Sequence, residues 1–113
     1  MEMTIEEALK RLTNVGLVAD YRGLGYVRIS GGVPLKAPSE FIMYPFQISY
    51  EPDEWVIRCH VPKPNPNEEI SLRFSTFDAG IEKIISLYEN CRIDWEYERD
   101  NIDPNELRRT SNR

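Results

Sequence analysis

A hairpin in the middle of the chain constrains the fold more than any other feature of the sequence. Residues 41–50 and 55–61 are two apolar runs, and the polar turn Glu51-Pro52-Asp53-Glu54 separates them. Successive side chains of a strand point to opposite faces, so alternate residues of each run share a face. These residues are Ile42, Tyr44, Phe46, Ile48 and Tyr50 in the first run, and Trp55, Ile57, Cys59 and Val61 in the second. Two matching apolar faces predict one sheet surface that a second layer must cover.

Two amphipathic helices are expected to supply this layer. The first, at residues 4–15, begins with a capping box formed by Thr4 and Glu7 and ends at Gly16. The second begins at Ser75 or Thr76 and continues to residue 91. Each segment carries apolar residues at helical spacing, namely Ile5, Ala8, Leu9, Leu12 and Val15 in the first, and Phe77, Ile81, Ile84, Ile85, Tyr88 and Cys91 in the second.

Four further strands are expected, at residues 17–22, 26–30, 70–74 and 93–98. The last one rests on a strict alternation, in which Ile93, Trp95 and Tyr97 are separated by acidic residues. A strand, helix and strand in succession predict that 70–74 and 93–98 pair in parallel through a right-handed crossover. Residues 31–39, rich in glycine and proline, are expected to form a loop. Pro45 lacks a backbone N–H, so strand 41–50 is expected to be an edge strand or to carry a bulge.

These elements predict an α+β fold, a two-layer sandwich in the order α-β-β-β-β-β-α-β. Its sheet is mainly antiparallel with five to six strands, and two amphipathic helices cover one face. A chain of 113 residues has the size of one domain. We assign residues 1–100 to this domain and residues 101–113 to a polar C-terminal tail that is partly disordered.

The distribution of charge bears on the partners of the protein. The net charge is −5, and residues 51–106 carry 14 acidic but only six basic side chains. Such a surface repels nucleic-acid phosphates and favours a basic protein partner, with a purely solvated surface as the alternative. No apolar run approaches the roughly 20 residues of a membrane helix, and the acidic start is unlike a signal peptide. We therefore expect a cytoplasmic protein with no membrane or nucleic-acid partner.

The sequence offers no catalytic constellation. His60, the sole histidine, follows Cys59 directly, so the two side chains point to opposite faces of a strand and cannot form a nucleophile pair. Paired carboxylates occur in turns, in loops or on the outer face of a strand, where no pKa shift is expected. The two cysteines, Cys59 and Cys91, are expected to be reduced thiols, too few with one histidine for a zinc site. We expect no catalytic residues, no metal and no cofactor.

Three hypotheses for function remain. The first is a cytosolic accessory domain, inhibitor-like or immunity-like, that binds another protein without catalytic activity. Its contact residues are expected to be Phe41, Met43, Asp94, Trp95, Glu96, Tyr97 and Glu98. The second is a small-ligand-binding protein or enzyme with a pocket between sheet and helices, lined by Tyr44, Tyr50, Trp55 and His60. The third is a homodimer that pairs through the edge of strand 41–50 or of strand 93–98.

Overall fold

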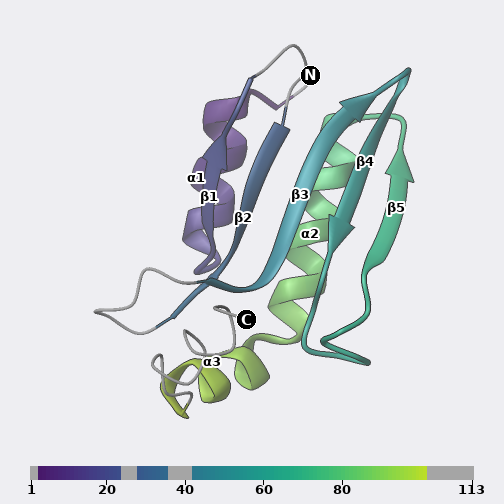
Figure 1. Cartoon of the computed structure of the whole chain (residues 1–113). Coiled ribbons are helices and arrows are strands. Elements are labelled where there is room, and N and C mark those ends of the chain that lie inside the picture. The colour runs from purple at the N-terminus through teal and green to yellow at the C-terminus, as the bar shows by residue number, and fades with distance from the viewer. Residues whose placement is uncertain (1–2, 24–27, 36–41, 102–113) are drawn as a thin grey trace.

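The computed structural model describes residues 3–23, 28–35 and 42–101 as an α+β fold of two layers (Figure 1). The described elements are α1 (Ile5–Asn14), β1 (Val18–Tyr21), β2 (Arg28–Pro34), β3 (Ile42–Glu51), β4 (Glu54–Cys59), β5 (Ile70–Phe74), α2 (Phe77–Asn90) and α3 (Arg92–Asn101). The five strands form one sheet in the order β1-β2-β3-β4-β5, and every neighbouring pair is antiparallel. The predicted sandwich with a mainly antiparallel sheet is therefore confirmed.

Both α1 and α2 lie on the same face of the sheet, and α3 lies at one end of the sandwich (Figure 1). The register places Ile29, Ile48 and Ile57 side by side across β2, β3 and β4 on the helix-covered face. Among the described elements, none covers the opposite face, which we call the open face. The core between the layers includes Ala8 and Leu12 of α1, Phe77, Ile81, Ile84 and Tyr88 of α2, and Ile29, Phe46, Ile48, Ile57 and Cys59 of the sheet.

The predicted helix starts follow from their caps. The Thr4 side chain accepts a hydrogen bond from the backbone N–H of Glu7, and the Glu7 carboxylate accepts one from the backbone N–H of Thr4. Gly16 follows α1 with a φ of +103°, a conformation that favours glycine. Thr76 caps α2 by accepting from the N–H of Ala79 at 3.2 Å. Both helices therefore begin where the sequence places them.

The region around Gly31 and Gly32 differs from the prediction, because it belongs to β2 and not to a loop. The register pairs Gly31 with Phe46 and Val33 with Met43, so two residues of β3 face Gly32 alone. This is a β-bulge, and Tyr44 within it has a φ of +51°. A side chain at Gly31 would place its Cβ 2.0 Å from the carbonyl oxygen of Val18, so only glycine permits this approach of the strands.

The bulge has two consequences for β3. It confirms the bulge expected at Pro45, because β3 lies between β2 and β4 and has no free edge. It also reverses the alternation of side chains, so Met43 faces the core and Ile42 is exposed. The expected single face from Ile42 to Tyr50 is therefore wrong at its beginning. Dimerisation through the edge of strand 41–50 is excluded, because β3 has a neighbouring strand on each side.

Residues 93–98 lie within α3, so the expected sixth strand and its parallel crossover are wrong. On a helix, a residue lies about 200° around the axis from the residue two positions before it. The alternation therefore puts Trp95 on one side of α3 and both Ile93 and Tyr97 on the other. Trp95 is only 2% exposed, whereas the other two side chains face outward. Without a strand at 93–98, dimerisation through its edge is excluded as well.

Three further expectations concern Phe41, the C-terminal tail and the membrane. Phe41 and residues 102–113, which include almost all of the predicted tail, lie outside the described residues. Within residues 3–23, 28–35 and 42–101, no helix is both long enough and apolar enough to cross a membrane.

Candidate functional site

The four residues expected to line a pocket between sheet and helices do not meet at one place. Tyr50 and Trp55 pack against each other at the hairpin end, with tilted rings whose centroids are 5.0 Å apart, and Trp55 also packs on Phe77 of α2 at 4.7 Å. Tyr44 is buried at the bulge. His60 is half-buried and lines a pocket on the open face. The structure thus brings together the side chains of Tyr50 and Trp55 at the hairpin end, and only the backbones of Tyr44 and His60 at the bulge.

The hydroxyl of Tyr88 connects α2 to the bulge. It lies 2.6 Å from the carbonyl oxygen of Tyr44, to which it donates, and 3.0 Å from the carbonyl oxygen of His60. The backbone N–H of His60 donates to the carbonyl of Pro45 at 2.9 Å and closes the same region. Burial raises the pKa of Tyr88 well above its ordinary value, so the hydroxyl keeps its proton. The role of this tyrosine is therefore to hold β3 and β4 onto α2.

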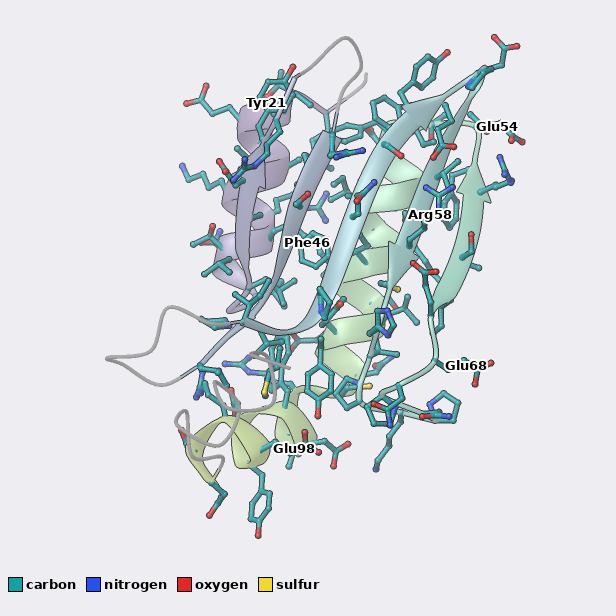
Figure 2. The ribbon with its side chains drawn as sticks, in the orientation of Figure 1. Tyr21, Phe46, Glu54, Arg58, Glu68 and Glu98 are labelled. Atoms are coloured by element: carbon teal, nitrogen blue, oxygen red, sulfur yellow. The ribbon has the colours of Figure 1, made fainter. Side chains whose placement is uncertain are left out.

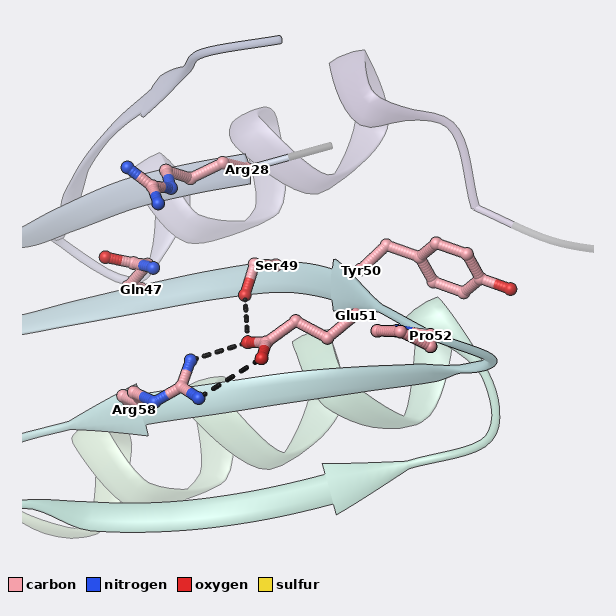
Figure 3. Close-up of a pocket in the computed structure, with 7 residues that line it drawn as sticks. All are labelled: Arg28, Gln47, Ser49, Tyr50, Glu51, Pro52 and Arg58. Carbon is pink, nitrogen blue, oxygen red and sulfur yellow. Dashed lines mark hydrogen bonds and ion pairs between the residues drawn. The ribbon is translucent and has the colours of Figure 1, made fainter. Parts of the chain in front are cut away.

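The open face carries a pocket of about 440 Å³ at the hairpin end of β3 (Figure 3). Its lining residues are Arg28, Gln47, Ser49, Tyr50, Glu51, Pro52 and Arg58. The Glu51 carboxylate accepts from both Nη1 and Nη2 of Arg58, at 2.6 and 3.3 Å, and from the Ser49 hydroxyl at 2.9 Å. Hydrogen bonds from Arg58 and Ser49 lower the pKa of Glu51 to about 2. This carboxylate is therefore ionised at neutral pH and already bound by its neighbours.

A second open-face pocket, of about 320 Å³, adjoins the first because both are lined by Gln47 and Arg58. His60 and Glu69 both line this pocket. Figure 2 shows Arg58 at the middle of β4, whereas Phe46 of β3, which also lines this pocket, belongs to the core. The open face can thus offer polar groups of both signs to a small molecule.

The outward side of α3 has a different character. Ile93 is 84% exposed and Tyr97 is 69% exposed, the largest values among the large hydrophobic residues that the structure describes. The two residues are one helical turn apart, so their side chains are neighbours. Acidic residues flank this pair around the helix, and we define the α3 outer face as Ile93, Asp94, Glu96, Tyr97 and Asp100.

The carboxylates of the α3 outer face are held by basic residues of the same chain. Asp94 forms an ion pair with Lys63 at 3.1 Å, and Glu96 forms one with Arg92 at 2.8 Å. All four side chains remain more than a third exposed, so each pair contributes little to stability and is available to a competing charge. The α3 outer face therefore combines an apolar centre with an acidic rim.

The residues predicted to contact a partner fall into three groups. Tyr97, Asp94 and Glu96 lie on the α3 outer face, and Glu98, half-buried, lies on the same helix (Figure 2). Met43 and Trp95 face the core, where Trp95 packs 5.8 Å from Tyr88 between ring centroids. Ile93, the most exposed residue of the α3 outer face, is not among the predicted contacts. The alternation of residues 93–98, interpreted as a helix and not as a strand, would have placed this residue beside Tyr97 on the outer side.

Comparison of the chain with protein-family models, with curated proteins and with solved structures returned no match. In the part of the chain that the structure describes, no three His, Cys, Asp or Glu side chains are grouped as metal ligands. The functional assignment therefore rests on the geometry and chemistry of these surfaces.

Proposed function

We propose that this protein is a non-catalytic cytoplasmic domain that binds another protein through the α3 outer face. The observation that carries the proposal is the exposure of Ile93 and Tyr97, at 84% and 69%. Exposed apolar side chains that are clustered and rimmed by polar residues are typical of protein interaction sites. Two apolar anchors one turn apart are also the pattern by which a helix binds in a groove.

The charges of α3 indicate the kind of partner. Asp94, Glu96 and Asp100 surround the apolar pair, and residues 51–106 as a whole carry 14 acidic against six basic side chains. A partner with complementary charge would associate faster and be selected against acidic competitors. We therefore propose a partner with an apolar depression that is rimmed by lysine or arginine.

The attachment of α3 to the body favours tight binding. Trp95 is buried, and its ring lies 3.7 Å from where a Cβ at Gly16 would stand. This single large side chain anchors the helix from its inner side while the outer side stays in water. A helix that is ordered before binding loses less conformational entropy when the partner associates.

The burial of the two cysteine thiols supports the proposal that the domain is non-catalytic. Burial raises the pKa of the Cys59 thiol to about 11, which makes it a poor nucleophile at neutral pH. Both cysteines are buried free thiols, and a reducing cytoplasm would keep them so.

Affinity capture with matched variants tests the proposal. The tagged protein, an Ile93→Glu/Tyr97→Glu variant and a Tyr21→Glu control are immobilised and exposed to lysate of the native cell. Tyr21 is an exposed aromatic residue of β1, 43% exposed and remote from α3. We expect the wild type and the control to retain one basic protein in near-stoichiometric amount, and the α3 variant to lose it.

The captured protein is then purified and titrated against each variant, so that the contact is measured directly. We expect its affinity to fall at least tenfold for Ile93→Glu/Tyr97→Glu, and to fall by less for Glu96→Lys, because rim charges act mainly on the association rate. Equal affinity for the wild type and the α3 variant would overturn the assignment of the surface.

A small-ligand function is the second candidate, and one observation favours it. His60, Glu69 and Arg58 line the same open-face pocket of about 320 Å³. A thermal-shift screen of small charged metabolites against the wild type and His60→Ala tests this candidate. A ligand that raises Tm of the wild type but not of His60→Ala would favour it over protein binding.

A further inference from the structure

The sheet has two edges, and they differ in how their apolar side chains are arranged. The strand order places β1 at one edge and β5 at the other. On β1, the exposed apolar residues Val18 and Tyr21 point to opposite faces of the sheet, so they form no continuous row. On β5, Ile70, Leu72 and Phe74 point toward the helix-covered face and are only half-buried. An edge strand with a row of half-buried apolar side chains is suited to pairing with another strand.

The side of α2 next to β5 extends this apolar row. A Cβ at Gly80 would lie 3.4 Å from Ile57 of β4 and 3.9 Å from the Phe74 ring, so this side of the helix faces β4 and β5. Leu87 follows Gly80 by seven residues, which is about two turns, and therefore lies on the same side. Leu87 is also only partly buried. The β5 edge thus exposes apolar surface from both layers of the sandwich.

We propose that β5 pairs with β5 of a second copy of this chain, antiparallel and centred on Leu72, so that the two sheets become continuous. Residues directly opposite each other in an antiparallel pair point to the same face. If the helices of both copies lie on one side of the joined sheet, Ile70, Leu72 and Phe74 must lie opposite residues of this same apolar row in the second copy. The two-fold axis then passes between two directly opposed copies of one residue. With Leu72 as this residue, all five residues of β5 are paired.

The side chains of β5 fit this register. Ile70 would lie opposite Phe74 of the second copy, and Leu72 opposite its own equivalent, which covers the half-buried row. On the open face, Arg73 would lie opposite Ser71, so that no two like charges meet directly. Arg73 stays in reach of Glu54 of its own chain, to which it donates at 2.9 Å. The occupant that matches this edge in shape and charge is therefore the same edge.

This pairing leaves the α3 outer face accessible. In Figure 1, β5 forms one edge of the sheet, whereas α3 lies at the end of the sandwich toward β2. Dimerisation through β5 can therefore be tested independently of the proposed protein binding, with variants of β5 and β1 alone.

A disulfide across the two-fold axis tests the register. Opposed residues of an antiparallel pair have Cα atoms about 4.5–5.5 Å apart, within the range of a disulfide. Leu72→Cys would place two cysteines at this Cα separation, and the native Cys59 and Cys91 are buried. We expect mild oxidation to convert Leu72→Cys, but not a Val18→Cys control on the β1 edge, into a covalent dimer. Equal cross-linking of both variants, or of neither, would overturn the proposal.

Charge substitution tests the surface without a covalent bond. We expect light scattering to give twice 13.2 kDa for the wild type and 13.2 kDa for Leu72→Lys and for Leu72→Glu, since like charges would then be opposed. A long charged side chain at this half-exposed edge can reach water, so both variants should fold, which circular dichroism checks. Mixing the two should restore a dimer that contains one copy of each.

The outcomes of this mixing experiment are decisive in both directions. Restoration of the dimer by opposite charges supports direct contact between the two Leu72 positions. A wild type that is monomeric at high concentration, a dimer that survives either substitution, or a mixture that stays monomeric would each overturn the proposal.

Discussion

The two faces of the sheet bury apolar residues by different means, and β4 shows the difference within two adjacent positions. Ile57 and Val56 are both fully buried. Ile57 belongs to the hydrophobic core beneath the helices, whereas Val56 points to the open face and lies outside that core. Within residues 3–23, 28–35 and 42–101, burial on the second face is therefore achieved without a second layer.

Charged side chains provide the cover over Val56. Its neighbours on the open face are Glu54 and Arg58 along β4, and Ser49 and Arg73 across the strand pairs. Glu54 binds Arg73 at 2.9 Å, and Arg58 binds Glu51 of β3 at 2.6 Å. The aliphatic stems of such arginines can cover apolar surface while their charged ends stay in water. This cover consists of individual charged side chains, so it is more flexible than a packed helix and depends on charge.

The largest expected effect is on the free energy of unfolding, and it distinguishes cover by helices from cover by charged side chains. We expect Ile57→Ala to lower the free energy of unfolding by about 2–5 kcal/mol, because packed helices cannot fill the cavity. Val56→Ala should cost about 1–2 kcal/mol, the transfer term of two methyl groups, because the side chains above it can collapse inward. Urea unfolding of both variants measures the difference. A Val56→Ala cost equal to that of Ile57→Ala would show that the charged cover is as rigid as the helices.

The next effect concerns the connection between the helix layer and the bulge. We expect Tyr88→Phe to lower the free energy of unfolding by about 1–3 kcal/mol, because the buried carbonyl of Tyr44 loses its donor. Urea unfolding monitored by tryptophan fluorescence measures this loss. The matched control is Ile84→Val, which removes volume from the buried side of the same helix without removing a hydrogen bond. A Tyr88→Phe variant as stable as the wild type would mean that the hydroxyl adds nothing to the connection.

The smallest effect is the pH dependence of the open face. The pKa of Glu51 is lowered from 4.5 to about 2 in the folded protein by Arg58 and Ser49. A lowered pKa stabilises the folded state above pH 4.5, and this contribution is lost as the pH falls from 4.5 toward 2. We expect Glu51→Gln to be less stable than the wild type at pH 7, and the difference to shrink to a small remainder at pH 2. Urea unfolding at both pH values checks this; a gap that does not narrow with acid would contradict it.

Much of the fold could be predicted from periodicity and caps. The helix stripes, the capping box of Thr4 and Glu7, and the central hairpin involve residues that are close in sequence. The glycines of β2 could not be interpreted in this way. Gly31 is required because β1 approaches it from 12 positions earlier in the chain, a contact that no local pattern reports. The bulge opposite Gly32 has the same non-local origin.

The candidate site was harder to predict because exposure depends on the type of element. The alternation at residues 93–98 suits a half-buried strand, and it also suits a helix that buries only Trp95. The choice between them reverses the roles of the side chains, because a strand would place Ile93, Trp95 and Tyr97 on one face. Tertiary packing of Trp95 against Gly16 and Tyr88 decides for the helix.

The strand order of the sheet has a consequence for the speed of folding. Each strand pairs with the strand that precedes or follows it in the chain, so the sheet grows by successive hairpins. Closing a short connection costs little chain entropy, and folding rates rise as contacting residues lie nearer in sequence. The β3–β4 hairpin, with a two-residue turn between Glu51 and Glu54, can form first and act as a template for its neighbours. We expect this domain to fold faster than sandwiches of similar length whose strands cross over.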